Sequence, residues 1–230
     1  MTIFLESPIL WLSATIAAYL AAQCIAAWAG KPPILNPTLL GITAIATMLL
    51  VAGIPYEQYY KGASILHYAL GAAVVSLAVP LNRNLRRLRA DPVVLSAALL
   101  AGVLTSAFGG VAILIALNAG HVIIMSAAPK SATAAVSMEI ARGMGGLPAV
   151  TVCVTIATGI TGAVIGPYIL NIPGICRPNA RGVALGAVSH GIGTARAFNE
   201  SEITGCWATV ATCLGSLMTA LICSVLPALL

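Results

Sequence analysis

A lysine lies inside an otherwise apolar stretch of the chain, between Pro129 and Ser131. A charged side chain this far from a loop is costly in a membrane and is by default functional. Pro129 lacks an N–H group and breaks a helix, and Ser131 or Thr133 can cap the helix that restarts after it. The restarted N-terminus and Lys130 together offer N–H groups and positive charge to an anion. The alternative is a proline-kinked packing helix whose lysine extends to the membrane surface.

A second polar segment interrupts the apolar residues between 180 and 198. Gly191 and Gly193 permit an unwound backbone there. Arg196 adds a fixed charge that suits a carboxylate. The hydrogen-bonding side chains around the glycines are Ser189, His190 and Thr194. We interpret this segment as the second half of an anion site. The alternative is an interhelical packing segment whose histidine satisfies a buried carbonyl group.

Smaller motifs accompany these two segments. Gly182 and Gly186 form a G-x-x-x-G face that lets two helices approach closely. Asn36 opens another apolar stretch, where its side chain either caps a helix or contributes to ligand binding. Glu139 and Arg142 are three residues apart and are expected to pair on one helical face.

Patterns that carry catalysis or hold metals are missing from the sequence. Asp91, the only aspartate, lies next to Pro92 and a basic loop, so no Ser-His-Asp set is visible. Lys130 and Ser131 are adjacent, so on a helix their side chains point about 100° apart. They therefore do not form an obvious Ser-Lys catalytic dyad. The six cysteines include no C-x-x-C pair, and no P-loop, Rossmann or H-E-x-x-H motif occurs. We therefore expect no enzyme activity, no metal and no cofactor.

The elements that position these residues are membrane segments. Only 7% of the 230 residues are charged and 60% are hydrophobic, whereas a soluble domain carries roughly 25% charged residues. A helix needs about 20 apolar residues to cross the hydrocarbon core. The stretches that qualify without interruption are 8–28, 35–53, 92–117, 147–170 and 205–228. Those interrupted by polar residues, glycine or proline are 66–82, 120–142 and 180–198.

These stretches predict an all-α, polytopic membrane protein of about eight membrane elements, in a single domain spanning 1–230. Irregular backbone at membrane depth survives only where protein or water satisfies it. The interrupted segments are therefore expected inside the molecule, as broken or re-entrant helices. The charges leave open whether 120–142 and 180–198 span or re-enter the membrane, because each choice puts a different arginine outside. Inverted repeats are also left open.

A cluster of arginines in the loop 82–91 sets the expected topology. Positively charged residues favour the cytoplasmic side of a membrane, so we expect this loop to be cytoplasmic. Its four arginines are Arg83, Arg86, Arg87 and Arg89. The whole chain has a net charge of +5, but its cationic residues outside this loop form no basic patch. We expect the lipid bilayer as a partner and no nucleic acid.

Several of these motifs together resemble the LrgB/CidB family of bacterial membrane proteins, and the likeness extends over most of the chain. It is carried by Ala128-Pro129-Lys130-Ser131-Ala132-Thr133, by Gly145-Gly146-Leu147-Pro148-Ala149, by 181–196, by Asn36-Pro37, and by Ala78-Val79-Pro80-Leu81. The family usually has Val-Thr-Thr-Pro after the lysine-serine pair, where this chain has Ala132-Thr133-Ala134-Ala135.

The resemblance implies a multi-pass protein of the bacterial cytoplasmic (inner) membrane that works with a small LrgA/CidA-like membrane protein. Relatives look like carriers of small carboxylate anions such as pyruvate, glycolate and glycerate. The family was first described as antiholin-like regulators of a holin-like partner, murein hydrolase activity and lysis. We expect a carrier or carrier subunit, with the regulator as the alternative, and a homo-oligomer. The predicted substrate-binding residues are Lys130, Ser131, Thr133, Ser189, His190, Gly191, Gly193, Thr194, Arg196 and Asn36.

Overall fold

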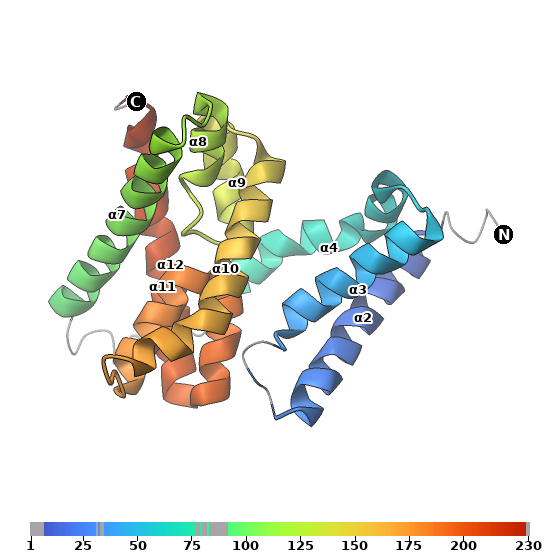
Figure 1. Cartoon of the computed structure of the whole chain (residues 1–230), viewed down its shortest axis with the longest axis horizontal. Helices are drawn as coiled ribbons and strands as arrows, with labels where there is room; N and C mark the ends of the chain where they lie inside the picture. Colours follow the sequence, from blue (N-terminus) through green and yellow to red (C-terminus); the bar gives the residue numbers. More distant parts are fainter. Residues whose placement is uncertain are drawn as a thin grey trace. The chain divides into compact units, whose positions relative to one another are not determined.

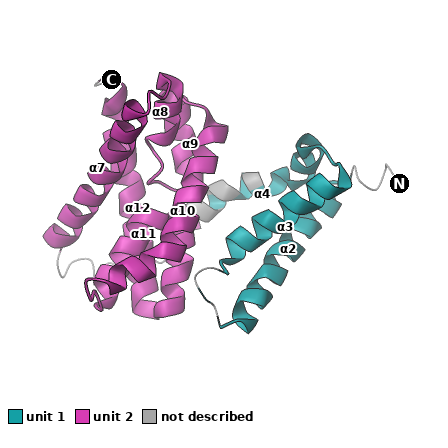
Figure 2. Ribbon diagram, in the orientation of Figure 1, with its two compact units in different colours: residues 1–75 teal, residues 76–230 magenta. Residues whose placement is uncertain are grey.

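The structure is a computed structural model that describes residues 7–30, 32, 35–76, 79, 82 and 92–228. Helices and turns account for these residues, and no strand occurs among them. The chain forms two compact units, residues 1–75 and 76–230 (Figure 2). The all-α prediction is confirmed. The single domain over 1–230 stays a prediction.

The described residues of unit 1 form the helices α2 (Pro8–Trp28), α3 (Pro37–Ala52) and α4 (Tyr56–Ser76) (Figure 1). Trp11 of α2 contacts Tyr59 of α4 edge-on, with ring centroids 5.9 Å apart. The Tyr59 hydroxyl also lies 3.1 Å from the Thr15 hydroxyl. Gly62 lies against the Trp11 side chain, and an added Cβ there would be 2.8 Å from the indole ring. Aromatic packing therefore joins α2 and α4.

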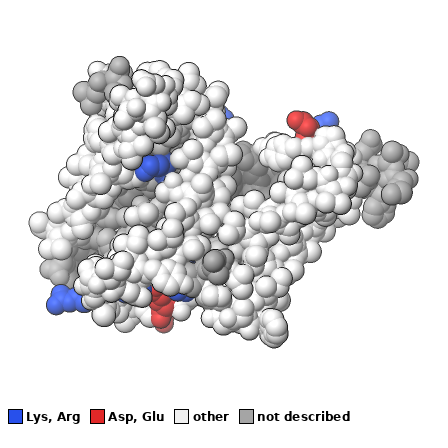
Figure 3. All heavy atoms as spheres, viewed as in Figure 1, with Lys and Arg blue, Asp and Glu red and all other residues white. Residues whose placement is uncertain are grey.

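The described residues of unit 2 include the long apolar helices α7 (Pro92–Ala116), α10 (Pro148–Asn171) and α12 (Glu202–Val225). Among the described residues, four helices are long and apolar enough to cross a membrane: Pro8–Trp28, Pro92–Ala116, Pro148–Asn171 and Glu202–Ala228. They match four of the predicted spans, and the fifth corresponds to the shorter helix α3. The interruption expected at Pro80 lies outside the described residues. The face shown in Figure 3 is uncharged over most of its area, as expected for a surface in contact with lipid.

The segment 120–142 is a re-entrant hairpin, which we call hairpin 1. It consists of α8 (His121–Ala127), a turn over 128–133, and α9 (Ala134–Gly143). At 1.5 Å per residue the two helices are about 10 and 15 Å long, about half or less of the roughly 30 Å hydrocarbon core. Both helices join the rest of the unit at the same end (Figure 1).

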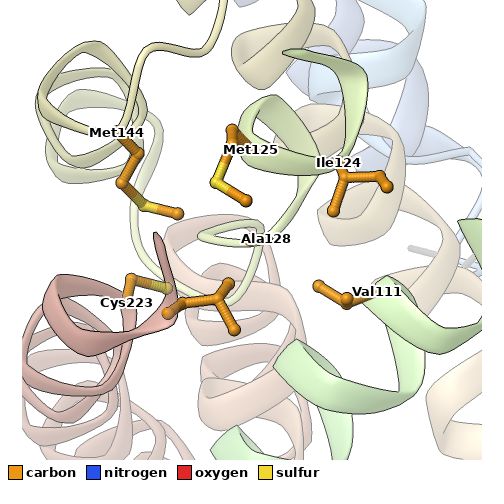
Figure 4. Packing of buried hydrophobic residues seen from close by; sticks show 7 residues of the cluster. Val111, Ile124, Met125, Ala128, Met144 and Cys223 are labelled. Carbon is orange, nitrogen blue, oxygen red and sulfur yellow. The ribbon is translucent and has the colours of Figure 1, made fainter. Parts of the chain in front are cut away.

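Apolar packing holds the base of hairpin 1. Met125 of α8 and Met144, just after α9, lie in one buried cluster with Val111 of α7 and Cys223 of α12. Figure 4 shows these side chains converging from the four elements. A hydrogen bond adds to this packing, because the Leu147 N–H donates to the Ser126 hydroxyl at 2.8 Å. Hairpin 1 is therefore fixed between α7 and α12 at its open end.

The second polar segment is also a re-entrant hairpin, hairpin 2, formed by α11 (Pro178–Glu200). The helix breaks at His190, whose φ is 45° and ψ is −129°. Beyond the break the chain folds back, and Arg181 near its start donates to the Glu200 carboxylate at its end, at 2.7 Å. In a straight helix residues 19 positions apart lie about 28 Å apart. The first arm is 178–189 and the second arm is 191–200.

Glycines let hairpin 2 pack closely against α12. A Cβ at Gly182 would overlap the Thr204 carbonyl oxygen and lie 2.7 Å from the Trp207 Cβ. A Cβ at Gly186 would lie 2.7 Å from the Ala208 Cα. Between the arms, a Cβ at Gly193 would overlap the Leu185 carbonyl oxygen. The G-x-x-x-G motif thus makes the helix contact that the sequence predicts.

A long helix followed by a re-entrant hairpin occurs twice in unit 2, in opposite directions. In Figure 1, α7 rises and hairpin 1 enters from the top, whereas α10 descends and hairpin 2 enters from the bottom. This is an inverted-topology arrangement, as in many transporters. Both polar segments re-enter, so Arg177 and Arg181 lie at the end from which α7 starts. The loop 82–91, predicted to be cytoplasmic, lies outside the described residues except for Asn82.

Candidate functional site

The tips of the two hairpins meet inside unit 2. The His190 imidazole donates its Nε2–H to the Lys130 carbonyl oxygen, at 2.6 Å. A carbonyl oxygen can only accept, so this contact fixes a hydrogen on Nε2. His190 is 4% exposed and Lys130 is half-buried. The two polar segments predicted from the sequence are therefore in contact, although Lys130 and His190 are 60 residues apart in the chain.

The Lys130 ammonium contacts α7 at Ser106. Its Nζ donates to the Ser106 carbonyl oxygen at 3.0 Å and also to the Ser106 hydroxyl. The Ser131 hydroxyl donates to the same Ser106 oxygen at 2.5 Å. Sequence reasoning missed Ser106. The available signal was a serine four residues before Gly110 in a largely apolar helix, a pattern that is common in membrane helix packing.

The two cations that the sequence predicts to bind substrate, Lys130 and Arg196, have no carboxylate partner among the described residues. Glu139 forms its ion pair with Arg142, at 2.8 Å, as the sequence predicts. Glu200 forms its own with Arg181, at 2.7 Å. Neither Lys130 nor Arg196 forms an ion pair within the part of the chain that the structure describes. Two half-buried positive charges are thus left without an ion-pair partner among the residues that the structure describes.

Several polar atoms near these elements are buried and lack a hydrogen-bond partner in the described part of the chain. They are Thr133 Oγ1, Thr155 Oγ1, Ser189 Oγ and Arg196 Nε. A buried polar atom without a partner costs roughly 1–3 kcal/mol. Such atoms in a native structure call for an explanation, and an absent ligand is one.

The start of α9 differs from the prediction. Thr133 occupies the N-cap position, but its side chain makes no capping hydrogen bond. Ser131 does not cap either, because its hydroxyl is engaged by Ser106. The expected side-chain cap is therefore wrong. The first N–H groups of a helix have no intrahelical acceptor; at α9 the Thr133 N–H donates to the Ser216 hydroxyl at 3.3 Å, and among the described residues the N–H groups that follow it have no side-chain cap from Thr133.

The residues of the second tip divide into two groups. Thr194 braces the hairpin, because its hydroxyl donates to the His190 carbonyl at 2.8 Å and lies 2.9 Å from the Thr212 hydroxyl. Gly193 serves the close packing of the two arms. Gly191 instead has open space where a Cβ would lie. The unwound position is His190 itself and neither glycine, contrary to the expectation from sequence.

Asn36 belongs to unit 1 and caps α3. Its side-chain oxygen accepts from the Thr38 N–H at 2.9 Å and from the Leu39 N–H at 3.4 Å. The capping alternative is confirmed, and these two bonds account for the side-chain oxygen. Its ligand-binding role stays a prediction.

The ion pair at the open end of hairpin 2 yields a stability prediction. Arg181 donates twice to Glu200, at 2.7 and 2.9 Å, and also to the Asn171 side chain and the Ile175 carbonyl. The two paired side chains are 13% and 15% exposed. Arg181→Gln is expected to destabilise the protein by about 1.5–3 kcal/mol, and Glu200→Gln by less, since the arginine then keeps two acceptors. Thermal unfolding of the purified protein measures both.

The matched control is Arg142→Gln, which breaks an ion pair whose side chains are 64% and 67% exposed. Exposed pairs contribute about 0–1 kcal/mol, so its melting temperature should stay near that of the wild type. Equal effects of Arg181→Gln and Arg142→Gln would contradict the role of Arg181 in closing the hairpin.

Comparison with known proteins assigns the chain to a family. The model of the LrgB-like family matches residues 15–229. Holin-like protein CidB of Staphylococcus epidermidis is 34% identical over 194 residues, which cover 84% of this chain and 83% of the relative. A Haemophilus influenzae protein is 30% identical over 205 residues, 89% and 87% of the two chains. The Bacillus subtilis protein YwbG is 33% identical over 184 residues, 80% and 82%.

No solved structure matches the chain. The family match covers nearly all residues, and the long apolar helices agree with a location in the membrane. The chain therefore belongs to the LrgB-like family and is a multi-pass protein of the bacterial cell membrane.

Proposed function

We propose that this protein is a transporter, or a subunit of one, for small monocarboxylates such as pyruvate, glycolate or glycerate, and not an enzyme. The observation that carries the proposal is the position of Lys130. It lies at the contact between two oppositely directed re-entrant hairpins and has no carboxylate partner among the described residues. A charge inside a membrane protein faces a partner, a cavity or a transport pathway.

The groups around Lys130 suit a carboxylate. An ammonium has three N–H donors, and the contacts to Ser106 use two of them. The third N–H remains, together with the uncapped first turn of α9. Helix N-termini favour anions through their free N–H groups and partial positive charge. Arg196, on the second arm of hairpin 2, is a further cation, and its buried Nε has no hydrogen-bond partner among the described residues.

The arrangement of the hairpins supports transport over simple binding. Hairpin 1 enters from one end of unit 2 and hairpin 2 from the other (Figure 1). Discontinuous elements that meet between inverted repeats form the substrate sites of many transporters, and rocking of one repeat against the other opens the site to each side in turn. In this protein the contact between Lys130 and His190 is the point that such a motion would open and close.

The second candidate is an antiholin-like regulator of a small holin-like membrane protein, controlling murein hydrolase activity and lysis. The observation in its favour is that similar proteins of staphylococci are named Holin-like protein CidB. The two roles require different properties of the buried cations. A regulator requires only intact interfaces, whereas a carrier requires the charges themselves.

Uptake into proteoliposomes tests the proposal. The protein is reconstituted with and without a CidA-like partner, and uptake of labelled pyruvate, glycolate and glycerate is measured against protein-free vesicles. We expect uptake of at least one acid that saturates and that the unlabelled acid inhibits. Folded protein that carries none of the three, with or without the partner, contradicts the transport proposal. Dye release by the partner that changes on adding this protein then supports the regulator.

A further inference from the structure

We propose that Ser106 is a positioning residue of the anion site. Together with Gly110 it forms a seat on α7, hereafter the α7 seat, that fixes the Lys130 ammonium where the substrate carboxylate binds. That the seat serves a bound anion rests on the proposed function. The contacts between Lys130 and Ser106 are independent of that function, so the restraint on Lys130 can be measured separately from transport.

Hydrogen bonds from hairpin 1 converge on Ser106. Lys130 Nζ donates to its carbonyl oxygen at 3.0 Å and to its hydroxyl, and the Ser131 hydroxyl donates to the same hydroxyl oxygen at 2.5 Å. A helical carbonyl has a second lone pair to spare, and a hydroxyl oxygen has two. Ser106 can thus accept all three bonds while its backbone stays in α7.

Gly110 makes room for the lysine side chain. It lies four residues after Ser106 and therefore on the same face of α7. A Cβ at this position would lie 3.0 Å from Lys130 Cε and 3.6 Å from Nζ. An added Cβ here would require the end of the Lys130 side chain to shift by a few tenths of an ångström. Ser106 thus accepts the hydrogen bonds of Lys130, and Gly110 leaves room for the lysine side chain beside α7.

The lack of charge on Ser106 is what makes the seat useful to an anion site. An acidic residue there would pair with Lys130 and cancel the charge that attracts the substrate. Neutral oxygens hold the ammonium in place but leave its charge to interact with a carboxylate. The seat also explains how a lysine with a flexible side chain presents its remaining N–H in one direction.

The experiment uses a Lys31→Arg, Lys61→Arg background, in which Lys130 is the only lysine. Two quantities are compared for the parent, Ser106→Ala and Ser106→Thr. One is the concentration dependence of pyruvate counterflow in proteoliposomes. The other is the rate at which formaldehyde and borohydride methylate Lys130, followed by mass spectrometry. Ser96→Ala is the matched control, because Ser96 is an exposed serine on the same helix.

Ser106→Ala is expected to raise the half-saturating pyruvate concentration about tenfold or more, the effect of losing hydrogen bonds to a charged group. The maximal rate should stay near that of the parent, and methylation of Lys130 should accelerate because its nitrogen is less restrained. Ser106→Thr keeps the hydroxyl and should restore both values, and Ser96→Ala should change neither. Should Ser106→Ala fail to reconstitute, Gly110→Ala tests the seat from its other side with the same expected changes.

Unchanged half-saturation and unchanged methylation in Ser106→Ala would overturn the seat while leaving transport by the parent, and so the proposed function, intact. Should the parent carry no pyruvate, the same counterflow is measured with glycolate and glycerate, and the proposed function loses its support if none of the three acids is carried with or without the partner. The methylation rates then decide the seat alone: a faster rate in Ser106→Ala that Ser106→Thr reverses supports it, and equal rates overturn it.

Discussion

Lys130→Gln is expected to remove carboxylate binding while the protein stays folded and inserted in the membrane. Glutamine is one atom shorter than lysine, but it keeps an amide N–H donor on the side that faces the Ser106 carbonyl oxygen, which Lys130 contacts at 3.0 Å. It lacks the charge that a carboxylate requires. Losing one charge-assisted hydrogen bond costs about 1.5–3 kcal/mol, a tenfold to hundredfold loss of affinity. Arg196→Gln, which removes the second unpaired cation, is expected to act in the same direction.

Thermal-shift titration with pyruvate, glycolate and glycerate measures this loss, because a ligand that binds the folded state raises the melting temperature. Lys61→Gln and Arg142→Gln are the matched controls. Both remove an exposed cation, the first in unit 1 and the second on α9. The controls should titrate like the wild type. Wild-type affinity in both Lys130→Gln and Arg196→Gln would contradict the anion site.

Gly186→Ala is expected to give the largest loss of stability for a single methyl group. Its Cβ would overlap the Ala208 carbonyl oxygen and lie 2.7 and 2.8 Å from the Ala208 Cα and carbonyl carbon. These are backbone atoms of α12, which cannot rotate away as a side chain does. Overpacking a tight contact typically costs about 1–3 kcal/mol and occasionally more. The double variant with Gly182→Ala should fail to hold hairpin 2 against α12.

Thermal unfolding in detergent and the yield of membrane-inserted protein measure this effect. Gly102→Ala is the matched control, since Gly102 is an exposed glycine of α7 with no atom within 4 Å of an added Cβ. Alanine favours a helix over glycine by about 1 kcal/mol, so the control should be as stable as the wild type or more so. Equal stability of Gly186→Ala and Gly102→Ala would show that hairpin 2 does not pack as described.

The membrane elements could be predicted from sequence because hydrophobic length and helix-breaking residues are local properties. Pro129 marks the tip of hairpin 1, and Gly182 and Gly186 mark a helix contact. Re-entry could not be predicted, since it depends on contacts between distant residues. Arg181 and Glu200 are 19 positions apart. Such a spacing does not place two residues side by side on a continuous helix, so the sequence does not indicate that they pair.

The site could be predicted only in part, for a similar reason. Lys130 and His190 stand out because polar groups are rare in apolar segments, and the structure brings them together. Ser106 does not stand out, because occasional serines in an apolar helix are ordinary and α7 also contains Ser96. The break at His190 was expected at the neighbouring glycines, which tolerate a positive φ. At His190 the tertiary bond to the Lys130 carbonyl stabilises a conformation that local propensity disfavours.

The central claim is that a substrate carboxylate binds the Lys130 ammonium where the two hairpins meet. Solid-state NMR tests it on protein in lipid bilayers, with Lys31 and Lys61 replaced by arginine so that Lys130 is the only lysine. The lysine side-chain nitrogen carries ¹⁵N, and bound pyruvate carries ¹³C at its carboxylate. We predict strong dipolar dephasing of the single lysine signal, as for a charge-assisted hydrogen bond with about 2.7–2.9 Å between nitrogen and oxygen. Bound pyruvate that leaves this signal undephased would contradict the claim.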